Sequence, residues 1–346
     1  MGLKEHMKEE YTKWKQEKEV LGRVTLEHKR MYRVWTELGE LLCEVSGKFS
    51  YQANSREDYP AVGDWVVIVP REEGKGTIIK LLPRFSKFSR KEAGHNTEEQ
   101  IVAANVDTVF LVNALNEDLN LRRLERYLTL TWESGANPVI LLTKADLCMN
   151  IEEKKAMVER VAFGVPVIVL SIVTHLGFDE LHSHLVSGKT IALLGSSGVG
   201  KSTLTNYLVG YNKQEVQEIR SSDAKGRHTT THRELILLPN HAILIDTPGM
   251  RELQLWNSQN GIHSSFADIE RLALNCKFRN CTHKKEEGCA VNLALITGDL
   301  EAERLSSYNK LLRELAYLDR KQNKKAKVEE KKKWKMINKQ MKNRQD

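Results

Sequence analysis

The chain has 346 residues, 40% of them hydrophobic, and a formal net charge of +7. This length and composition indicate a globular, soluble protein of two or three domains. The N-terminus lacks the apolar core of a signal peptide and no apolar run approaches the roughly 20 residues of a membrane span, so we expect a cytoplasmic protein without a membrane partner. We also expect a monomer.

The first predicted domain is a small barrel over residues 22–90, preceded by a variable lead-in over residues 1–21. In the lead-in, positively and negatively charged residues alternate, and apolar residues form no regular stripe beyond Tyr11 and Trp14. Short β-rich runs then follow, separated by Gly, Asn, Ser and Pro. The runs are residues 23–27, 32–36, 41–45, 64–69 and 77–82. Such short strands predict an OB-type β-barrel, a fold that closes its edges and offers a face to nucleic acid.

Alternating strand and helix patterns predict a parallel sheet in a central α/β domain over residues 91–262. Three of its loops match nucleotide-binding motifs, in the order 143–146, 195–202 and 246–249. In an ordinary GTPase the first of these motifs follows the other two. The order therefore indicates a circularly permuted P-loop GTPase domain.

Residues 195–202 have the pattern G-x-x-x-x-G-K-[ST] between an apolar strand and a helical pattern. Backbone N–H groups of such a loop surround the β-phosphate, Lys201 reaches the β- and γ-phosphates, and the Ser202 hydroxyl ligates Mg²⁺. The predicted phosphate-binding residues are Gly195, Ser196, Ser197, Gly198, Val199, Gly200, Lys201, Ser202 and Thr203.

The choice of GTP over ATP depends on residues 143–146, which follow an apolar strand. Asp146 can accept hydrogen bonds from the guanine N1–H and 2-amino group, a donor pair that adenine lacks, and Lys144 can cover the base. Thr143 stands where such loops more often have Asn. Ser171 and Ile172, after another apolar strand, lie where a GTPase closes over the base.

Asp246 and Gly249 belong to the last motif. The Asp positions Mg²⁺ and the Gly N–H senses the γ-phosphate. Residues 225–232 form a polar, Gly-containing segment typical of a mobile switch, in which either Thr229 or Thr230 can close on Mg²⁺.

Met250 follows Gly249, at the position where small GTPases commonly carry a water-orienting Gln. Intrinsic hydrolysis is therefore expected to be slow, and His228 is our candidate for placing the water. A solvated loop histidine or an RNA contact is the open alternative for His228.

A cysteine cluster characterises the predicted C-terminal helical domain, residues 263–320. Its spacing is C-x4-C-x-H-x5-C, and its members are Cys276, Cys281, His283 and Cys289. Four soft or borderline ligands fill a tetrahedral Zn²⁺ site and leave no position for water, so the ion is expected to be structural. Residues 321–346 form a tail with ten Lys and one Arg against two Glu and one Asp, which favours a polyanion such as RNA.

With these motifs placed, the chain resembles the RsgA/YjeQ family of circularly permuted GTPases that act on the small ribosomal subunit. The likeness spans about residues 22–318. It is carried by YPAVGDW at 59–65, GRHTTT at 226–231, DTPGMRE at 246–252, CTH at 281–283 and GCAV at 288–291. Two positions depart from the family pattern, Thr143 for Asn and Ile172 for Ala.

The resemblance implies late maturation of the 30S subunit, contact with 16S rRNA and hydrolysis stimulated by that subunit. It also implies an apolar residue at Met250 and a switch histidine at His228. Two alternative functions remain open from the sequence. One is an RNA-binding assembly factor that uses GTP as a conformational ligand with negligible turnover, and the other is a P-loop ATPase or kinase.

Overall fold

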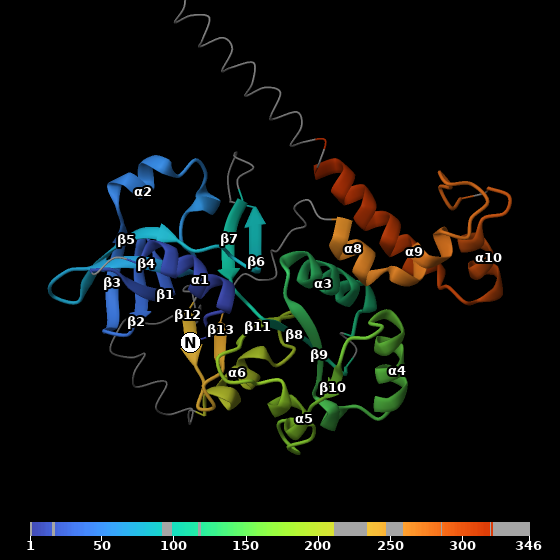
Figure 1. The fold of residues 1–346 in the computed structure, drawn as a ribbon. Helices are drawn as coiled ribbons and strands as arrows, with labels where there is room; N and C mark the ends of the chain where they lie inside the picture. The colour runs from blue at the N-terminus through green and yellow to red at the C-terminus, as the bar shows by residue number, and fades with distance from the viewer. Residues whose placement is uncertain are drawn as a thin grey trace, which may run out of the picture. The chain divides into compact units, whose positions relative to one another are not determined.

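The computed structural model describes residues 2–15, 18–91, 99–116, 119–210, 234–246, 259–284, 286–318 and 320. The chain forms two compact units, Met1–Gln254 and Leu255–Asp346 (Figure 1). The first unit contains a β-barrel and an α/β sheet, and the second is helical.

Five strands close into a barrel at the start of the first unit, in blue to cyan in Figure 1. They are β1 (Val20–His28), β2 (Met31–Thr36), β3 (Gly39–Val45), β4 (Trp65–Pro70) and β5 (Lys75–Leu81). β1 pairs with β2 and β4, β3 pairs with β2 and β5, and β4 pairs with β5, so the circuit closes. Alternate residues are buried, as Tyr32, Val34 and Thr36 are on β2. The predicted barrel is confirmed.

Two short elements connect β3 to β4: α2 (Gly47–Gln52) and the 3-10 turn η1 (Arg56–Asp58). A further helix, α1 (Glu5–Trp14), precedes the barrel and packs against it. Leu3, Met7 and Tyr11 recur every four residues, the spacing of one helix face, and Met7 is fully buried in a cluster with Trp65. The lead-in therefore contains a structural element that its alternating charges conceal.

A predominantly parallel sheet forms the rest of the first unit and confirms the predicted α/β domain. Its strand order is β10 (Val167–Val169), β9 (Asn137–Thr143), β8 (Thr108–Ala114), β11 (Thr190–Leu194), β13 (Ile243–Asp246) and the antiparallel β12 (Glu234–Leu237). Strands buried on both faces read as continuous apolar runs, as β8 and β9 do.

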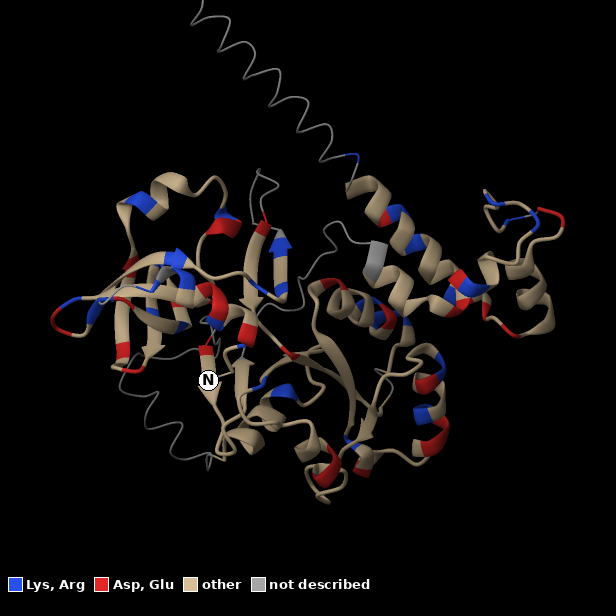
Figure 2. Cartoon of the chain, viewed as in Figure 1, with Lys and Arg blue, Asp and Glu red and all other residues tan. Residues whose placement is uncertain are grey.

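The helices of this domain are α3 (Leu121–Ser134), α4 (Ile151–Val161), α5 (Phe178–Ser183) and α6 (Lys201–Val209), with the 3-10 turn η2 (Ala145–Leu147) after β9. Asn120 caps α3 by accepting a hydrogen bond from the Arg123 N–H, and Gly135 ends it at φ 87°. Along α4, acidic and basic residues follow one another in the sequence (Figure 2).

The barrel and the parallel sheet are continuous, because β1 pairs with β12 through Leu26 and Glu234. Between them lies a separate hairpin of β6 (Lys87–Lys91) and β7 (Glu99–Ala104). The sequence reads as a polar stretch over most of this hairpin, and its strands were not predicted.

A buried arginine joins the barrel to the sheet. Arg23 on β1 is 1% exposed, and its guanidinium donates hydrogen bonds to the Thr190 hydroxyl at 2.6 Å and to the Gly63 carbonyl at 3.3 Å. Burial lowers the pKa of Arg23 to about 10, against the opposing charges of Asp107 and Asp64, so it remains protonated at neutral pH. Its charge and its hydrogen bonds hold the two parts of the unit together.

A buried ion pair lies beside Arg23. The Asp64 carboxylate is fully buried and accepts hydrogen bonds from Arg84 Nε and Nη2 at 2.9 and 2.7 Å. It also accepts one from the Ala61 N–H at 2.8 Å. Such a carboxylate has its hydrogen-bonding capacity satisfied, which is the condition for burying a charge at tolerable cost.

Asp64→Asn is therefore expected to lower the free energy of unfolding of the first unit by about 3 kcal/mol, because it leaves the largely buried Arg84 without its facing carboxylate. Urea unfolding followed by tryptophan fluorescence measures the change. Glu44→Gln is the matched control, since Glu44 pairs with Arg71 and both side chains are about half exposed. Loss of such an exposed ion pair is expected to lower the free energy of unfolding by about 0.5 kcal/mol or less. Equal losses for the two variants would contradict the role given to Asp64.

The second unit consists of α8 (Gln259–Ser265), α9 (Ala267–Ala273), a Cys/His loop, α10 (Ala290–Thr297) and a helix over residues 302–318. Arg304 of the last helix is 7% exposed and pairs with Asp268 through two hydrogen bonds of 2.7 Å. The Tyr308 hydroxyl donates to Glu270 at 2.6 Å. These contacts tie the last helix to α9.

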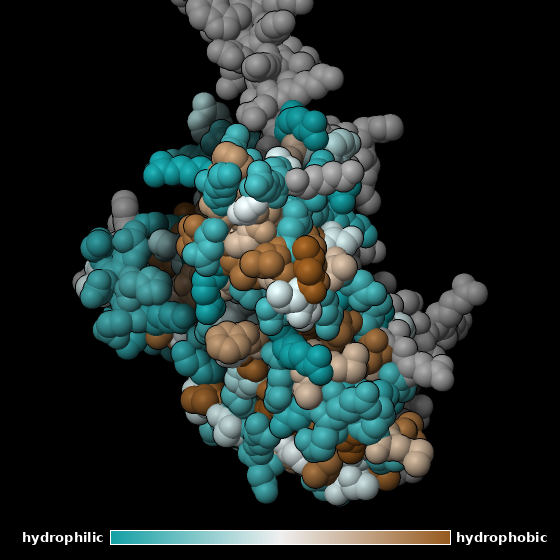
Figure 3. All heavy atoms as spheres, turned by 90° about the vertical axis from the view of Figure 1, so that its right-hand side faces the viewer, coloured by the Kyte–Doolittle hydropathy of each residue, from teal (hydrophilic) through white to brown (hydrophobic). Residues whose placement is uncertain are grey.

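Some apolar side chains of this unit face solvent, including Leu274 on the loop and Leu293 and Ile296 on α10. On the face drawn in Figure 3, apolar residues form small groups among hydrophilic ones. Among the described residues, every helix is too short or too polar to cross a membrane.

Candidate functional site

The predicted phosphate loop lies between β11 and the first turn of α6. A Cβ at Gly195 would lie 2.3 Å from the Val112 carbonyl oxygen, so the close approach of the two backbones requires glycine. Gly198 and Gly200 have φ values of 78° and 98°, which other residues rarely adopt. The glycines of the motif are therefore explained by backbone geometry.

Lys201 opens α6, and its ammonium group lies over the loop. It donates hydrogen bonds to the carbonyl oxygens of Gly195, at 2.8 Å, and of Ser196. Ser202 and Thr203 are exposed on the same first turn. An exposed loop at a helix N-terminus, with a lysine and a hydroxyl beside it, is suited to a polyphosphate and its Mg²⁺.

The predicted guanine loop follows β9, next to the phosphate loop. Thr143 is buried, and its hydroxyl lies 2.6 Å from the Val199 carbonyl oxygen of the phosphate loop. This hydroxyl joins the two loops, so the structure gives Thr143 a positioning contact inside the protein. The sequence motif alone contains no signal for this contact, because Val199 is far away along the chain.

Asp146 is exposed after the left-handed Lys144, whose φ is 60°. The buried Ser171, after β10, donates a hydrogen bond to Asp146 Oδ1 at 2.6 Å. Ile172 packs against the apolar core of the sheet. The structure thus brings residues 143–146 and 171–172 together, as expected for loops at the carboxyl ends of adjacent parallel strands.

An aromatic group behind this loop was not predicted. His175 lies in the loop that Ser171 begins, with its ring centroid 6.2 Å from those of Phe178 and Tyr207. Tyr207 is on α6, and its ring lies 4.1 Å from that of Phe178. These contacts link the base-closing loop to the helix that begins at the phosphate loop.

Several predicted residues lie outside the described part of the chain. They are His228, Thr229, Thr230 and Gly249. Asp246 ends β13, whose backbone is described, but its side chain is not. The basic tail, residues 321–346, also lies outside the described part of the chain.

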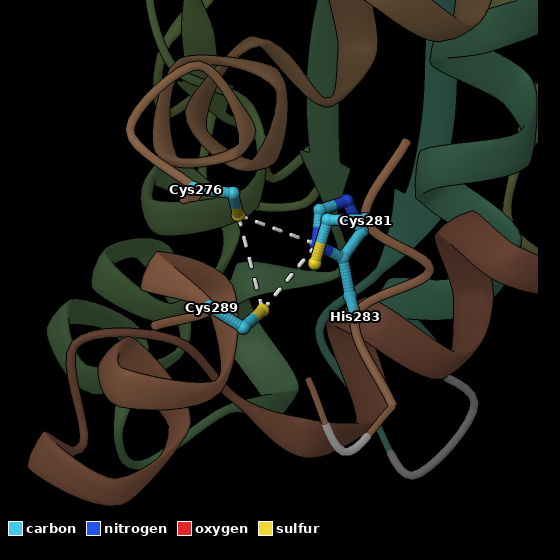
Figure 4. A group of neighbouring side chains, drawn as sticks. All are labelled: Cys276, Cys281, His283 and Cys289. Carbon is cyan, nitrogen blue, oxygen red and sulfur yellow. Dashed lines mark hydrogen bonds between the residues drawn. The ribbon is translucent and has the colours of Figure 1, made fainter. Parts of the chain in front are cut away.

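The four predicted metal ligands come together in the second unit. Their ligand atoms all lie within 4.8 Å of one another, and the side chains point toward a common centre (Figure 4). His283 Nδ1 lies 3.6 Å from Cys276 Sγ and 3.5 Å from Cys289 Sγ, and the two sulfur atoms are 3.9 Å apart. Sulfur ligands of tetrahedral Zn²⁺ lie about 3.8 Å apart, so this set fits zinc.

Local sequence shapes the loop that carries these ligands. Gly288 has φ 76° and packs against Lys277, whose N–H donates to the Gly288 carbonyl oxygen at 3.0 Å. The Glu286 carboxylate accepts hydrogen bonds from the Thr282 side chain and from the N–H groups of Thr282 and Lys284. These bonds lower the pKa of Glu286 to about 2. The loop is therefore held in shape around the ligands.

The electrostatics of the cluster also favour a cation. Burial raises the pKa of Cys276, but hydrogen bonds from the Val291 and Ala290 N–H groups, at the start of α10, lower it overall. Burial and the neighbouring thiols raise the pKa of Cys281 to about 11. A divalent cation bound between these sulfur atoms would favour the thiolate form of each cysteine, because its positive charge stabilises the deprotonated ligand.

Comparison with protein families gives two matches. The RsgA GTPase model matches residues 81–256. A second model, described as a 50S ribosome-binding GTPase, matches residues 190–329 and therefore begins at β11, the strand before the phosphate loop.

Known relatives align along most of the chain. The small ribosomal subunit biogenesis GTPase RsgA 1 of Oceanobacillus iheyensis is 48% identical over 94% of this chain and 93% of its own length. RsgA 2 of Lactiplantibacillus plantarum, which carries the same description, is 48% identical over 88% of this chain and 85% of its own.

Two solved structures share the fold. YjeQ from Thermotoga maritima superposes with a TM-score of 0.65 at 28% identity, covering 86% of this chain and 99% of its own. YloQ, described as a circularly permuted GTPase, gives a TM-score of 0.61 at 24% identity, covering 86% of this chain and 95% of its own.

Proposed function

Because the chain belongs to the RsgA GTPase family, we propose that it hydrolyses GTP during the biogenesis of the small ribosomal subunit. The observation that carries this proposal is the juxtaposition of the phosphate loop with Asp146, through the Thr143 contact to Val199 and the Ser171 contact to Asp146. One site then offers both a polyphosphate cradle and a carboxylate for the guanine edge.

We assign roles within this site by chemistry. Backbone N–H groups of residues 195–200 bind the β-phosphate, Lys201 neutralises the β- and γ-phosphates, and Ser202 is a ligand for the Mg²⁺ of the nucleotide. Asp146 accepts from guanine N1–H and the 2-amino group, while Ser171 and Ile172 close over the base. Thr143 positions the two loops relative to each other.

The remaining roles rest on sequence position. Thr229 or Thr230 completes the Mg²⁺ ligands, Asp246 positions that ion, and Gly249 senses the γ-phosphate. We propose His228 as the group that places the attacking water, since Met250 has no strong hydrogen-bonding group. The domain boundaries given above are proposed on the same basis.

The second unit is proposed to hold one Zn²⁺ through Cys276, Cys281, His283 and Cys289. Zinc supplies a structural cross-link there, since four protein ligands leave no open coordination position. The partner is proposed to be the 30S subunit, with 16S rRNA in contact with the barrel and the basic tail, and the protein is proposed to act as a cytoplasmic monomer.

GTP hydrolysis by the zinc-loaded protein with purified 30S subunits tests this function. We expect 30S subunits to raise turnover by about tenfold or more, because outside groups that complete a GTPase site accelerate it strongly. ATP and 50S subunits are the controls, and the match to a 50S-binding family model makes the second one informative.

Equal stimulation by 50S subunits would contradict the proposed partner. GTP-dependent binding to 30S subunits without stimulated turnover would instead favour the assembly factor that uses GTP as a conformational ligand. Preference for ATP would favour a P-loop ATPase or kinase.

A further inference from the structure

The base-closing loop, residues 171–176, is held by backbone contacts at its two ends. The Ser171 N–H donates to the Leu176 carbonyl oxygen at 3.2 Å, and the Leu176 N–H donates to the Ser171 carbonyl oxygen at 3.1 Å. Between these ends, Val173, Thr174 and His175 are exposed. The position of the loop therefore depends on the side chains that it packs against the rest of the unit.

The aromatic group of His175, Phe178 and Tyr207 provides this packing. The His175 ring contacts both other rings, at centroid distances of 6.2 Å. Phe178 is 5% exposed and belongs to the apolar core of the sheet. Tyr207 is partly buried against that core, and its ring lies 4.1 Å from that of Phe178 at an interplanar angle of 45°. Tyr207 is therefore the partner of His175 that can be altered with the smaller loss of core packing.

The aromatic group completes a circuit of contacts through the three nucleotide-binding loops. Tyr207 belongs to α6, the helix that begins at Lys201 of the phosphate loop. The Thr143 hydroxyl joins the phosphate loop to the guanine loop, and the Ser171 hydroxyl joins the guanine loop to the base-closing loop. The contact of His175 with Tyr207 then joins the base-closing loop back to α6. The base-closing loop is thus positioned relative to the phosphate loop from both sides.

Ser171 makes the position of the base-closing loop important for recognition of the base. Its hydroxyl donates to Asp146 Oδ1 at 2.6 Å and accepts from the Thr174 N–H, within the loop, at 3.2 Å. Because Asp146 is exposed, the direction of its carboxylate depends on this hydrogen bond. A carboxylate accepts from both the N1–H and the 2-amino group of guanine only when its two oxygens face that edge, so movement of the loop weakens the paired contact.

Resting on the GTPase function proposed above, we propose that Tyr207 is a positioning residue that sets the preference of this site for guanine. Its ring holds the base-closing loop in the place from which Ser171 orients the Asp146 carboxylate. The ligands that this arrangement selects are purine nucleotides with a 2-amino group. Inosine nucleotides, which keep the N1–H and lack the 2-amino group, are the class that it disfavours.

Tyr207→Leu removes the ring and keeps an apolar side chain against the core. We expect its Kd for fluorescent mant-GDP to rise about tenfold, because the paired contact includes a hydrogen bond to a charged acceptor that the displaced loop weakens. Its Kd for mant-IDP is expected to rise by less than about threefold, since IDP has no 2-amino group to lose. The preference for GDP over IDP therefore falls. General destabilisation would lower the binding-competent fraction for both nucleotides alike and leave that preference unchanged.

Three further variants show whether the ring is responsible. Tyr207→Phe keeps the ring, and we expect it to hold both dissociation constants within about twofold of the wild type. Asn206→Ala is the matched control, since Asn206 is exposed beside Tyr207 on α6, and we expect the same result for it. His175→Asn removes the ring on the loop side, and asparagine tolerates the φ of 56° at this position. We expect it to lower the preference for GDP over IDP as Tyr207→Leu does.

Steady-state turnover with 30S subunits separates this inference from the proposed function. For Tyr207→Leu we expect the KM for GTP to rise about tenfold and kcat to stay within about twofold of the wild type, because Lys201 and the phosphate loop are retained. A wild-type protein that prefers GDP to IDP but shows no stimulated turnover would contradict the proposed function alone.

Three results would overturn the role of Tyr207. They are equal losses of GDP and IDP affinity in Tyr207→Leu, a loss in Tyr207→Phe or Asn206→Ala as large as that in Tyr207→Leu, and an unchanged preference for GDP in both Tyr207→Leu and His175→Asn. Wild-type turnover stimulated by 30S subunits alongside any of them shows that the proposed function stands without this role.

Discussion

Lys201→Ala is expected to reduce 30S-stimulated GTP turnover by about 100-fold or more. Lys201 is the only basic residue in the sequence 195–203, so its loss leaves the phosphate loop without a charged side chain. Its ammonium donates to the carbonyl oxygens of Gly195 and Ser196, which holds the charge over the loop where phosphates would bind. The turnover number at saturating GTP and 30S subunits measures the effect.

Lys155→Ala is the matched control for Lys201→Ala. Lys155 lies on α4, where it pairs with Glu159 at 3.8 Å on an exposed face, and its removal is expected to leave turnover within about twofold of the wild type. The melting temperatures of both variants establish that they fold. A folded Lys201→Ala protein whose stimulated turnover stays within about threefold of the wild type would contradict phosphoryl transfer at this loop.

The chemistry-bearing loops were predictable because their function imposes local sequence patterns. The glycines at 195, 198 and 200 are required by a close backbone approach or a positive φ, and such requirements are visible in one short segment. The four residues of the Cys/His cluster are likewise close in sequence, so their spacing predicts that they meet. The barrel was predictable from short strands bounded by turn residues.

Contacts between distant segments were not predictable in the same way. Arg23 lies in a strand where a charged residue normally indicates a solvent-facing position, yet Thr190 accepts its hydrogen bond in the buried junction. The Thr143 contact to Val199 and the aromatic group of His175 and Tyr207 also join segments far apart in the chain. A single sequence shows which residue types are present, but it does not show which distant residues bury them or accept their hydrogen bonds.

The hairpin of β6 and β7 was missed, and the bounds of helix α1 within the lead-in were left open, for a different reason. Both elements are rich in charged residues, so their apolar positions are few, and packing against the rest of the unit stabilises them rather than local propensity. Met7 illustrates this, because a single buried side chain anchors an otherwise charged helix in the cluster around Trp65.

Cys289→Ser is expected to abolish zinc binding and unfold much of the second unit. Cys289 is both a proposed zinc ligand and the N-cap of α10, where its sulfur accepts from the Asn292 N–H at 3.4 Å. The loop around it packs mostly polar side chains, so the ion supplies stability that core burial does not. Structural zinc sites contribute about 10–16 kcal/mol of apparent binding free energy at neutral pH, more than a helical unit of this size gains otherwise.

Zinc content per chain and limited proteolysis measure this effect, and a strong chelator should reproduce it in the wild type. Cys148→Ser is the matched control, since Cys148 lies after η2 in the first unit and outside the cluster. We expect this control to retain one zinc ion and wild-type protection of residues 259–318. If Cys289→Ser retained both, the cluster would be a set of packed thiols, and the second unit would have to be held by contacts such as Arg304 with Asp268.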